Sequence, residues 1–174
     1  MPEIRLTPTS YVVLGLIEQL QPATPYDLKQ AAAVGVAQFW SLPHTQLYSE
    51  PERLAKAGYL SEKREQGGRR RRIYRLTGAG KRALEGWRSE PTRELYELRD
   101  AGLLKLFFGA DPRAMAEPQL EAHRGRLAEY EEQLEQCRRM AAPAGIRLAI
   151  EAGIGHEREY VRFWSRVAEP DGRG

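Results

Sequence analysis

Five arginines lie within seven residues of the first half of the chain, at positions 69–72 and 75. They directly follow the pair Gly67-Gly68. Clustered cations of this kind supply salt-dependent affinity for phosphate groups. A Gly-Gly pair favours a tight turn, so the cluster is expected at the tip of a hairpin, exposed to a polyanion. A solvated basic loop without a ligand is the alternative interpretation.

Apart from this basic cluster, the residue spacing points to no chemistry, and nothing in it predicts catalysis or metal binding. The sequence contains no nucleophile elbow, P-loop or dinucleotide fingerprint. Its three histidines, His44, His123 and His156, lie far apart, and none of them is part of a metal-ligand motif. The single cysteine, Cys137, excludes an intrachain disulfide and a cysteine metal cluster. We therefore expect a protein that is not an enzyme and that holds no metal and no cofactor.

The charges are distributed unevenly along the 174 residues. Residues 1–88 contain 14 Lys+Arg and 8 Asp+Glu, whereas residues 89–174 contain 13 and 16. This asymmetry indicates two roles on one chain. No apolar run approaches the roughly 18 residues of a membrane span, and the N-terminus lacks the apolar region of a secretory signal. A cytoplasmic protein with no membrane partner is the expectation.

Three helices would position the basic cluster. Thr7 and Thr24 each precede a proline and an apolar stretch, which predicts capped helices that begin at residues 8 and 25. A third helix is expected to end at Gly58, with Leu47 and Leu54 on its apolar face.

Two strand-like segments, 60–65 and 69–76, then flank Gly67-Gly68 and predict a β-hairpin. Thr77 is expected to cap a fourth helix that ends near Trp87.

The second half is expected to be helical throughout, with helices over about residues 89–108 and 118–141 and a last helix that carries Ile146, Ile150, Ile154, Val161 and Trp164. Together with His123 and Ala141, the apolar residues of the middle helix recur every three or four positions, the spacing of a coiled-coil seam. The stripe consists of Leu120, Leu127, Tyr130, Leu134 and Cys137. Because the stripe is narrow, it needs a partner helix, either from a second subunit or from the last helix of the same chain.

The order of three helices, a basic hairpin and further helices is that of a winged helix-turn-helix. The sequence resembles the PadR family of bacterial winged-helix transcriptional regulators, in its longer form with a helical C-terminal domain. The resemblance covers residues 10–88. It rests on Val-Leu-Gly-Leu-Ile at 13–17, Pro-Tyr-Asp-Leu-Lys at 25–29, His-Thr-Gln-Leu-Tyr at 44–48 and Tyr-Arg-Leu-Thr-Gly-Ala-Gly at 74–80.

The resemblance implies a mainly α fold with two domains. Residues 1–88 would form an N-terminal winged helix-turn-helix with a two-stranded β wing. Residues 89–170 would form a helical C-terminal domain for dimerisation and effector response, and residues 171–174 a flexible tail.

The resemblance also implies contacts with double-stranded operator DNA. The residues concerned are Tyr26, Lys29, His44, Thr45, Gln46, Tyr48, Ser49, Gly68, Arg69, Arg70, Arg71 and Arg72. By their chemistry, His44 and Gln46 suit base edges, whereas Tyr26, Lys29 and Tyr48 suit phosphates. Two alternatives remain, in which His44 caps the recognition helix and Tyr48 is a half-buried core aromatic.

Two prolines depart from the family pattern. Pro25 replaces a glycine and fits the first position of a helix. Pro51 replaces a leucine on the core face of the expected recognition helix, where a proline removes one backbone hydrogen bond and costs about 3 kcal/mol or more. We therefore expect this helix to be kinked or to start late, with Ser49 as its cap.

In the family the partner helix of the seam comes from a second subunit, so the resemblance implies a homodimer. The expected interface comprises Leu120, Leu127, Tyr130, Leu134, Cys137 and Trp164. A small aromatic effector is a further expected partner. Its candidate pocket residues are Trp40, Phe107, Phe108 and Trp164, with ordinary core aromatics as the alternative.

The sequence thus predicts a sequence-specific DNA-binding regulator. We expect a repressor that binds an inverted-repeat operator as a homodimer and is released by a small-molecule effector. A winged-helix module that binds RNA or protein without ligand response is the alternative.

Overall fold

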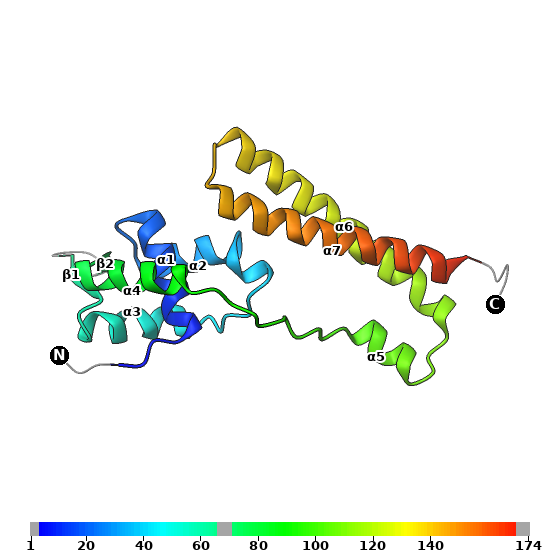
Figure 1. The fold of residues 1–174 in the computed structure, drawn as a ribbon, viewed down its shortest axis with the longest axis horizontal. Helices are drawn as coiled ribbons and strands as arrows, with labels where there is room; N and C mark the ends of the chain where they lie inside the picture. The colour runs from blue at the N-terminus through cyan, green and yellow to red at the C-terminus, as the bar shows by residue number, and fades with distance from the viewer. Residues whose placement is uncertain (1–3, 66–70, 170–174) are drawn as a thin grey trace. The chain divides into compact units, whose positions relative to one another are not determined.

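The computed structural model describes residues 4–65 and 71–169 of the chain. Two compact units are present, Met1–Glu94 and Leu95–Gly174. The first contains the helices α1 to α4 and the strands β1 and β2, and the second contains α5, α6 and α7 (Figure 1). In the described residues, no helix combines the length and the apolar character needed to cross a membrane.

The N-terminal unit begins with two capped helices, as the sequence predicts. α1 (Pro8–Leu20) and α2 (Pro25–Ala33) each start at a proline that follows a threonine N-cap. In both, the threonine hydroxyl accepts a hydrogen bond from the backbone N–H three residues later, and that residue's side chain bonds back to the cap. Each capping box satisfies two backbone donors that the helix itself leaves without partners.

The third helix, α3 (Gln46–Lys56), follows a short 3₁₀ turn, η1 (Val36–Gln38). The expectation that Ser49 caps this helix is wrong, because α3 begins at Gln46 and its N-cap is Thr45, four residues before Ser49. Pro51 lies inside α3, and its ring is fully buried. The ring thus occupies the core position of an apolar side chain, which offsets part of the cost of the missing backbone donor.

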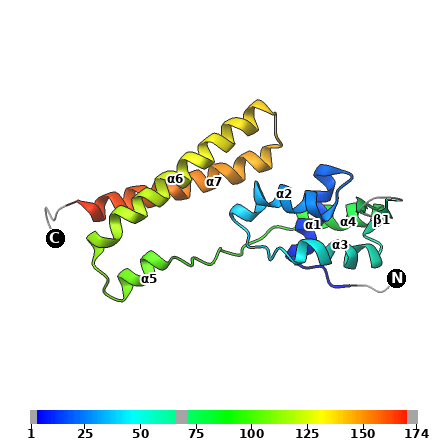
Figure 2. The same cartoon turned by 180° about the vertical axis from the view of Figure 1, so that it is seen from behind.

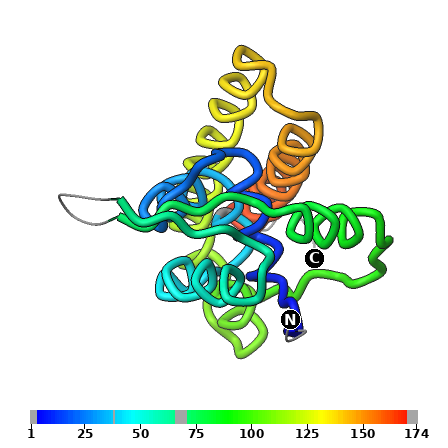
Figure 3. Tube along the Cα trace, turned by 90° about the vertical axis from the view of Figure 1, so that its left-hand side faces the viewer, coloured from blue at the N-terminus to red at the C-terminus, as the bar shows by residue number. Residues whose placement is uncertain are grey.

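The predicted hairpin is confirmed. β1 (Leu60–Arg64) and β2 (Arg72–Leu76) pair antiparallel from Leu60 opposite Leu76 to Arg64 opposite Arg72, and Figure 3 shows them side by side. An isolated bridge joins Ala23 to Tyr74, with mutual backbone hydrogen bonds of 3.1 and 2.8 Å. This bridge fixes the segment before α2 to the hairpin.

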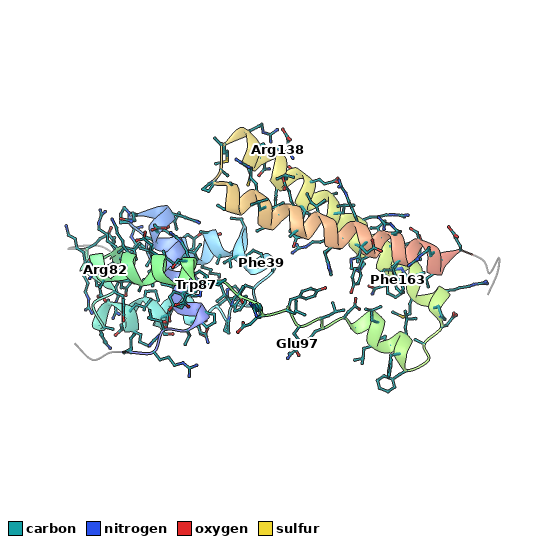
Figure 4. The ribbon with its side chains drawn as sticks, viewed as in Figure 1. Phe39, Arg82, Trp87, Glu97, Arg138 and Phe163 are labelled. Atoms are coloured by element: carbon teal, nitrogen blue, oxygen red, sulfur yellow. The ribbon has the colours of Figure 1, made fainter. Side chains whose placement is uncertain are left out.

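α4 (Gly78–Ser89) closes the N-terminal unit, and Thr77 caps it as predicted. At Gly80 an added Cβ would lie 2.2 Å from the Tyr59 carbonyl oxygen, so this close approach requires glycine. Trp87, labelled in Figure 4, stacks on Tyr11 of α1 with ring centroids 4.8 Å apart. The core between the helices and the hairpin contains Val13, Leu14, Ile17, Leu28, Leu47, Leu54, Tyr74 and Leu84.

The C-terminal unit is a helical hairpin with one short additional helix. α6 (Pro112–Arg139) and α7 (Ala144–Ala168) lie side by side along much of their length (Figures 1 and 2). α5 (Ala101–Phe107) packs against α6. The fold class expected from the sequence, mainly α with a winged helix and a helical C-terminal region, is confirmed.

The helix expected over residues 89–108 is wrong for most of its length. Residues 90–100 contain no helix, and α5 begins only after its cap, Asp100. Leu95 and Tyr96 are 93% and 75% exposed, so a helix there would bury no apolar face in its own unit. By contrast, α6 begins six residues earlier than expected, at Pro112, and continues through Pro118.

The apolar stripe of α6 is covered by α7 of the same chain. Leu120, Tyr130 and Leu134 are less than 10% exposed, and Ile154 of α7 packs in the same cluster as Tyr130 and Leu134. Trp164 of α7 is fully buried beside Leu120. Of the two partner helices considered for this stripe, the intrachain one is therefore present. A dimer interface through these residues, together with the half-buried Leu127 and Cys137, stays a prediction.

Candidate nucleic-acid interface

The beginning of α3 presents several polar side chains to solvent, as a helix that reads DNA bases must, while Leu47 faces the core. His44, Thr45, Gln46 and Ser49 are exposed, and Tyr48 is 49% exposed. Thr45, not His44, is the N-cap, although its own side chain forms no capping hydrogen bond. The alternative in which His44 caps the helix is therefore wrong.

The two residues predicted on α2 lie in its first half. Tyr26 is 61% exposed and Lys29 is half-buried. Since α2 packs against α3, both residues belong to the helix-turn-helix formed by these two helices.

The side-chain amide of Gln46 is held by α1. The Thr9 hydroxyl donates a hydrogen bond to Gln46 Oε1 at 2.9 Å. Ser49, in the first turn of α3, donates its hydroxyl to the Thr45 carbonyl at 3.3 Å. Gln46 thus has a defined side-chain orientation before any ligand arrives.

A charged network on the inner face of α3 fastens it to α1. Glu50, only 9% exposed, accepts hydrogen bonds from Ser10 Oγ at 2.6 Å and from Arg53 Nε and Nη2 at 2.8 and 2.6 Å. Arg53 also donates to Ser10 Oγ at 3.0 Å and to the Arg5 carbonyl at 3.3 Å. Burial raises the pKa of the Glu50 carboxyl, but the bonds from Arg53 and Ser10 and the Arg53 charge outweigh burial and leave this pKa lowered.

This network was not predicted from the sequence. A signal was present, because Leu47, Glu50, Pro51 and Leu54 share the apolar face of an 11-residue helix and only Glu50 among them is charged. An arginine three residues after such a carboxylate is a ready partner on the same helix face.

A second ion-pair cluster joins the wing to the recognition helix. Glu52 of α3 accepts from Arg72 Nη1 at 2.6 Å and pairs with Lys56 Nζ at 2.9 Å. Glu62 of β1 lies 3.7 Å from Arg72 Nε. The hydrogen bond from Lys56 and then that from Arg72 lower the pKa of Glu52. Arg72 is thus engaged within the protein, although the sequence predicted it as a phosphate contact.

The remaining wing residues differ in their surroundings. Arg71 pairs with Glu65 at 3.1 Å. Arg75 is exposed and, among the described residues, forms no ion pair. The predicted contacts Gly68, Arg69 and Arg70 lie outside the described residues.

The aromatic residues predicted for an effector pocket lie in unlike environments. Phe107 and Phe108 are 83% and 77% exposed, with ring centroids 5.2 Å apart. Trp40 is 44% exposed. Trp164 is fully buried, and its indole nitrogen has no hydrogen-bond partner among the described residues. Trp164 therefore offers no accessible surface to a ligand in this conformation.

No group of three or more His, Cys, Asp or Glu side chains in the described part of the chain has the arrangement of a metal site.

The chain is similar to known proteins over most of its length. Residues 13–86 match the sequence profile described as "Transcriptional regulator PadR-like family". The "Negative transcriptional regulator PadR" of Bacillus subtilis (strain 168) is 25% identical over 173 residues, which cover 90% of this chain and 93% of that protein.

Two solved structures share the fold. Bacillus subtilis PadR in complex with operator DNA aligns with a TM-score of 0.81 at 21% identity, covering 95% of this chain and 98% of that chain. Bacillus subtilis PadR in complex with p-coumaric acid aligns with a TM-score of 0.73 at 22% identity, covering 91% and 95%. The likeness therefore includes the helical C-terminal unit as well as the winged domain.

Proposed function

Because this chain belongs to the PadR-like family of transcriptional regulators through its residues 13–86, we propose that it represses transcription by binding operator DNA in a sequence-specific manner. Its relatives are transcriptional regulators, a non-enzymatic class, so the chain is not an enzyme. The Bacillus subtilis relative carries the name of a negative regulator, which supports repression over activation.

One observation carries the proposal, namely the exposed and braced start of α3. His44, Gln46 and Tyr48 face solvent, and Gln46 is already fixed by Thr9. A helix whose N-terminal residues are exposed and held in place can enter a major groove and read base edges with little further ordering of its side chains. The wing is fixed to the same helix by the bond between Arg72 and Glu52, so both elements meet DNA as one unit.

The active form in this proposal is a homodimer. Two-fold protein symmetry matches an inverted repeat with half-sites about one helical turn apart. A second α3 doubles the base-reading surface, which supports the affinity that a repressor needs.

A small planar aromatic ligand would relieve repression. The complex of Bacillus subtilis PadR with p-coumaric acid supports a ligand of this class. Of the residues predicted to line an effector pocket, three are accessible to a ligand. They are Phe107 and Phe108 in the C-terminal unit and Trp40 in the N-terminal unit. The ligand can change operator affinity only by its differential affinity for the DNA-bound and free conformations, and a coupling of about 1–3 kcal/mol gives about 5- to 150-fold.

A duplex-shift assay with the DNA upstream of the protein's own gene tests this function. We expect a discrete complex that a scrambled duplex of equal length and an RNA of the same sequence compete poorly. Addition of p-coumaric acid or related phenolic acids is expected to weaken the complex. Equal competition by operator, scrambled duplex and RNA would contradict sequence-specific repression and would favour a general interaction module.

A further inference from the structure

The residue that fixes Gln46 lies outside the helix-turn-helix. Thr9 is in the first turn of α1, 37 positions before Gln46 in the chain, and its hydroxyl donates to Gln46 Oε1 at 2.9 Å. Thr9 is half-buried, whereas Gln46 is exposed at the first position of α3. The oxygen of the amide is therefore bonded to the protein, although the residue as a whole is exposed.

This hydrogen bond occupies one of the two lone pairs of Oε1 and restrains the plane of the amide, which favours the NH₂ half as the half presented to a ligand. A glutamine side chain has one acceptor oxygen and an NH₂ group with two donors. When it reads adenine, it uses both halves at once, accepting from N6 and donating to N7. With Oε1 engaged by Thr9, the NH₂ group is the half that has no partner among the described residues. The two N–H donors of this group match guanine best, because its major-groove edge offers two adjacent acceptors, N7 and O6, whereas adenine and thymine each offer one.

The turn that carries Thr9 is itself rigidly attached to α3. Ser10, the next residue, is fully buried and donates to Glu50 at 2.6 Å. Arg53 adds a bond to the same hydroxyl at 3.0 Å. These bonds fix the distance between the first turn of α1 and α3, so Thr9 remains within reach of Gln46.

From this geometry we propose that Thr9 is a specificity-determining positioning residue. It orients the Gln46 amide so that its NH₂ group faces the major groove and reads a guanine in each half-site. The inference rests on the proposed function, because it names what one residue of that DNA-binding surface reads.

The test is a selection of binding sites from a DNA duplex library with a randomised central segment, at one fixed salt concentration. The chain is used as wild type, T9V, T9S, Q46A and the double variant T9V/Q46A. Valine keeps the branched shape of threonine but lacks the donor, whereas serine keeps the donor. Thermal melting of each variant shows whether it is folded.

Wild type and T9S are expected to enrich guanine at one position of each half-site. T9V should lower this preference relative to adenine by about 2- to 10-fold, the effect of one hydrogen bond, because the freed amide can then pair with adenine. Q46A should abolish the preference. T9V/Q46A should behave like Q46A, since Thr9 acts only through Gln46.

Three results would overturn the inference, and they are distinguishable from one another. If wild type enriches a sequence but T9V enriches the same sequence to the same extent, Thr9 does not position Gln46, while the proposed function stands. If folded wild type enriches no sequence at all, the proposed function fails, and this inference fails with it. A change in T9V/Q46A beyond that of Q46A would also contradict it, because Thr9 would then act by another route.

Discussion

Glu50 is a nearly buried carboxylate on the inner face of the recognition helix. Its partners Ser10 and Arg53 come from α1 and from the next turn of α3, so one side chain determines how two helices meet. Buried charges cost free energy unless they are paired and hydrogen-bonded, and here both conditions are met. The network therefore positions α3 against α1, and removal of either partner is expected to destabilise the fold.

The lowered pKa of Glu50 predicts a specific loss of stability in acid. The carboxyl of the unfolded chain titrates near the ordinary value of 4.5, and that of the folded chain titrates lower. Between these two pKa values the unfolded state binds more protons than the folded state. The contribution of the ionised Glu50 to the free energy of unfolding is therefore fully present above about pH 4.5, and it is lost as the pH falls through the folded-state pKa. Urea unfolding between pH 3 and 7 measures this.

E50Q should remove most of that acid dependence and should lower the free energy of unfolding at neutral pH by about 1–3 kcal/mol. The matched control is E85Q, which changes an exposed glutamate of α4. An unchanged pH profile in E50Q would show that the network does not hold the charge as described.

Glu52 competes with DNA for the wing arginine. Because Glu52 occupies the Nη1 donor of Arg72 at 2.6 Å and offsets its charge, this carboxylate is expected to weaken any contact between Arg72 and a phosphate. E52Q is expected to tighten binding to all DNA sequences alike. The slope of the logarithm of the binding constant against the logarithm of the salt concentration should become steeper by about 0.9, the value for one added phosphate contact. Fluorescence anisotropy against salt concentration measures both effects. E94Q, which removes an equal charge at an exposed site of the same unit, controls for net charge. Equal changes in both variants would rule out a specific release of Arg72.

At the scale of elements, α3 contains a proline where its backbone would otherwise donate a hydrogen bond. P51L restores this donor and keeps an apolar side chain in the core, at the risk of mild overpacking. We expect the free energy of unfolding to rise by about 1 kcal/mol, measured as a higher melting temperature. A lower melting temperature would mean that the surrounding core is shaped to the proline ring.

The helices also show which features of the fold can be predicted from the sequence. Thr7, Thr24 and Thr77 are predictable as caps, because capping depends on residues only three positions apart. The prediction of a helix near residue 95 is wrong, because helical propensity does not show whether the apolar face of a helix would be buried. The pairings of Glu50 with Ser10 and of Gln46 with Thr9 join residues 40 and 37 positions apart. Neither was predictable from local spacing, although the charge of Glu50 on an apolar face was a visible sign.

At the scale of the whole molecule, the proposed function requires two copies of the chain. Light scattering at micromolar concentration is expected to give twice the mass of the 19.8 kDa chain, with and without DNA. The burial of Leu120, Tyr130 and Leu134 against α7 means that these residues do not by themselves require a second subunit. A monomer at these concentrations would remove the basis for an inverted-repeat operator.

The wing gives a second test at this scale. Substituting glutamine for Arg69, Arg70, Arg71 and Arg72 together should weaken binding to every sequence. The salt slope should fall by about 0.9 for each phosphate that the variant no longer neutralises. Q46A should instead relax base preference with little change in slope. An unchanged slope in the wing variant would show that these arginines do not contact phosphates.

The most direct test of sequence-specific binding is the ratio of dissociation constants for a selected operator and a scrambled duplex, measured from about 50 to 200 mM salt. We predict that both affinities fall with salt, because phosphate contacts contribute to both. The operator should remain bound about 10³-fold or more tightly than the scrambled duplex throughout. A ratio near one at every salt concentration would contradict sequence-specific binding, since DNA would then be held by charge alone and α3 would read no bases.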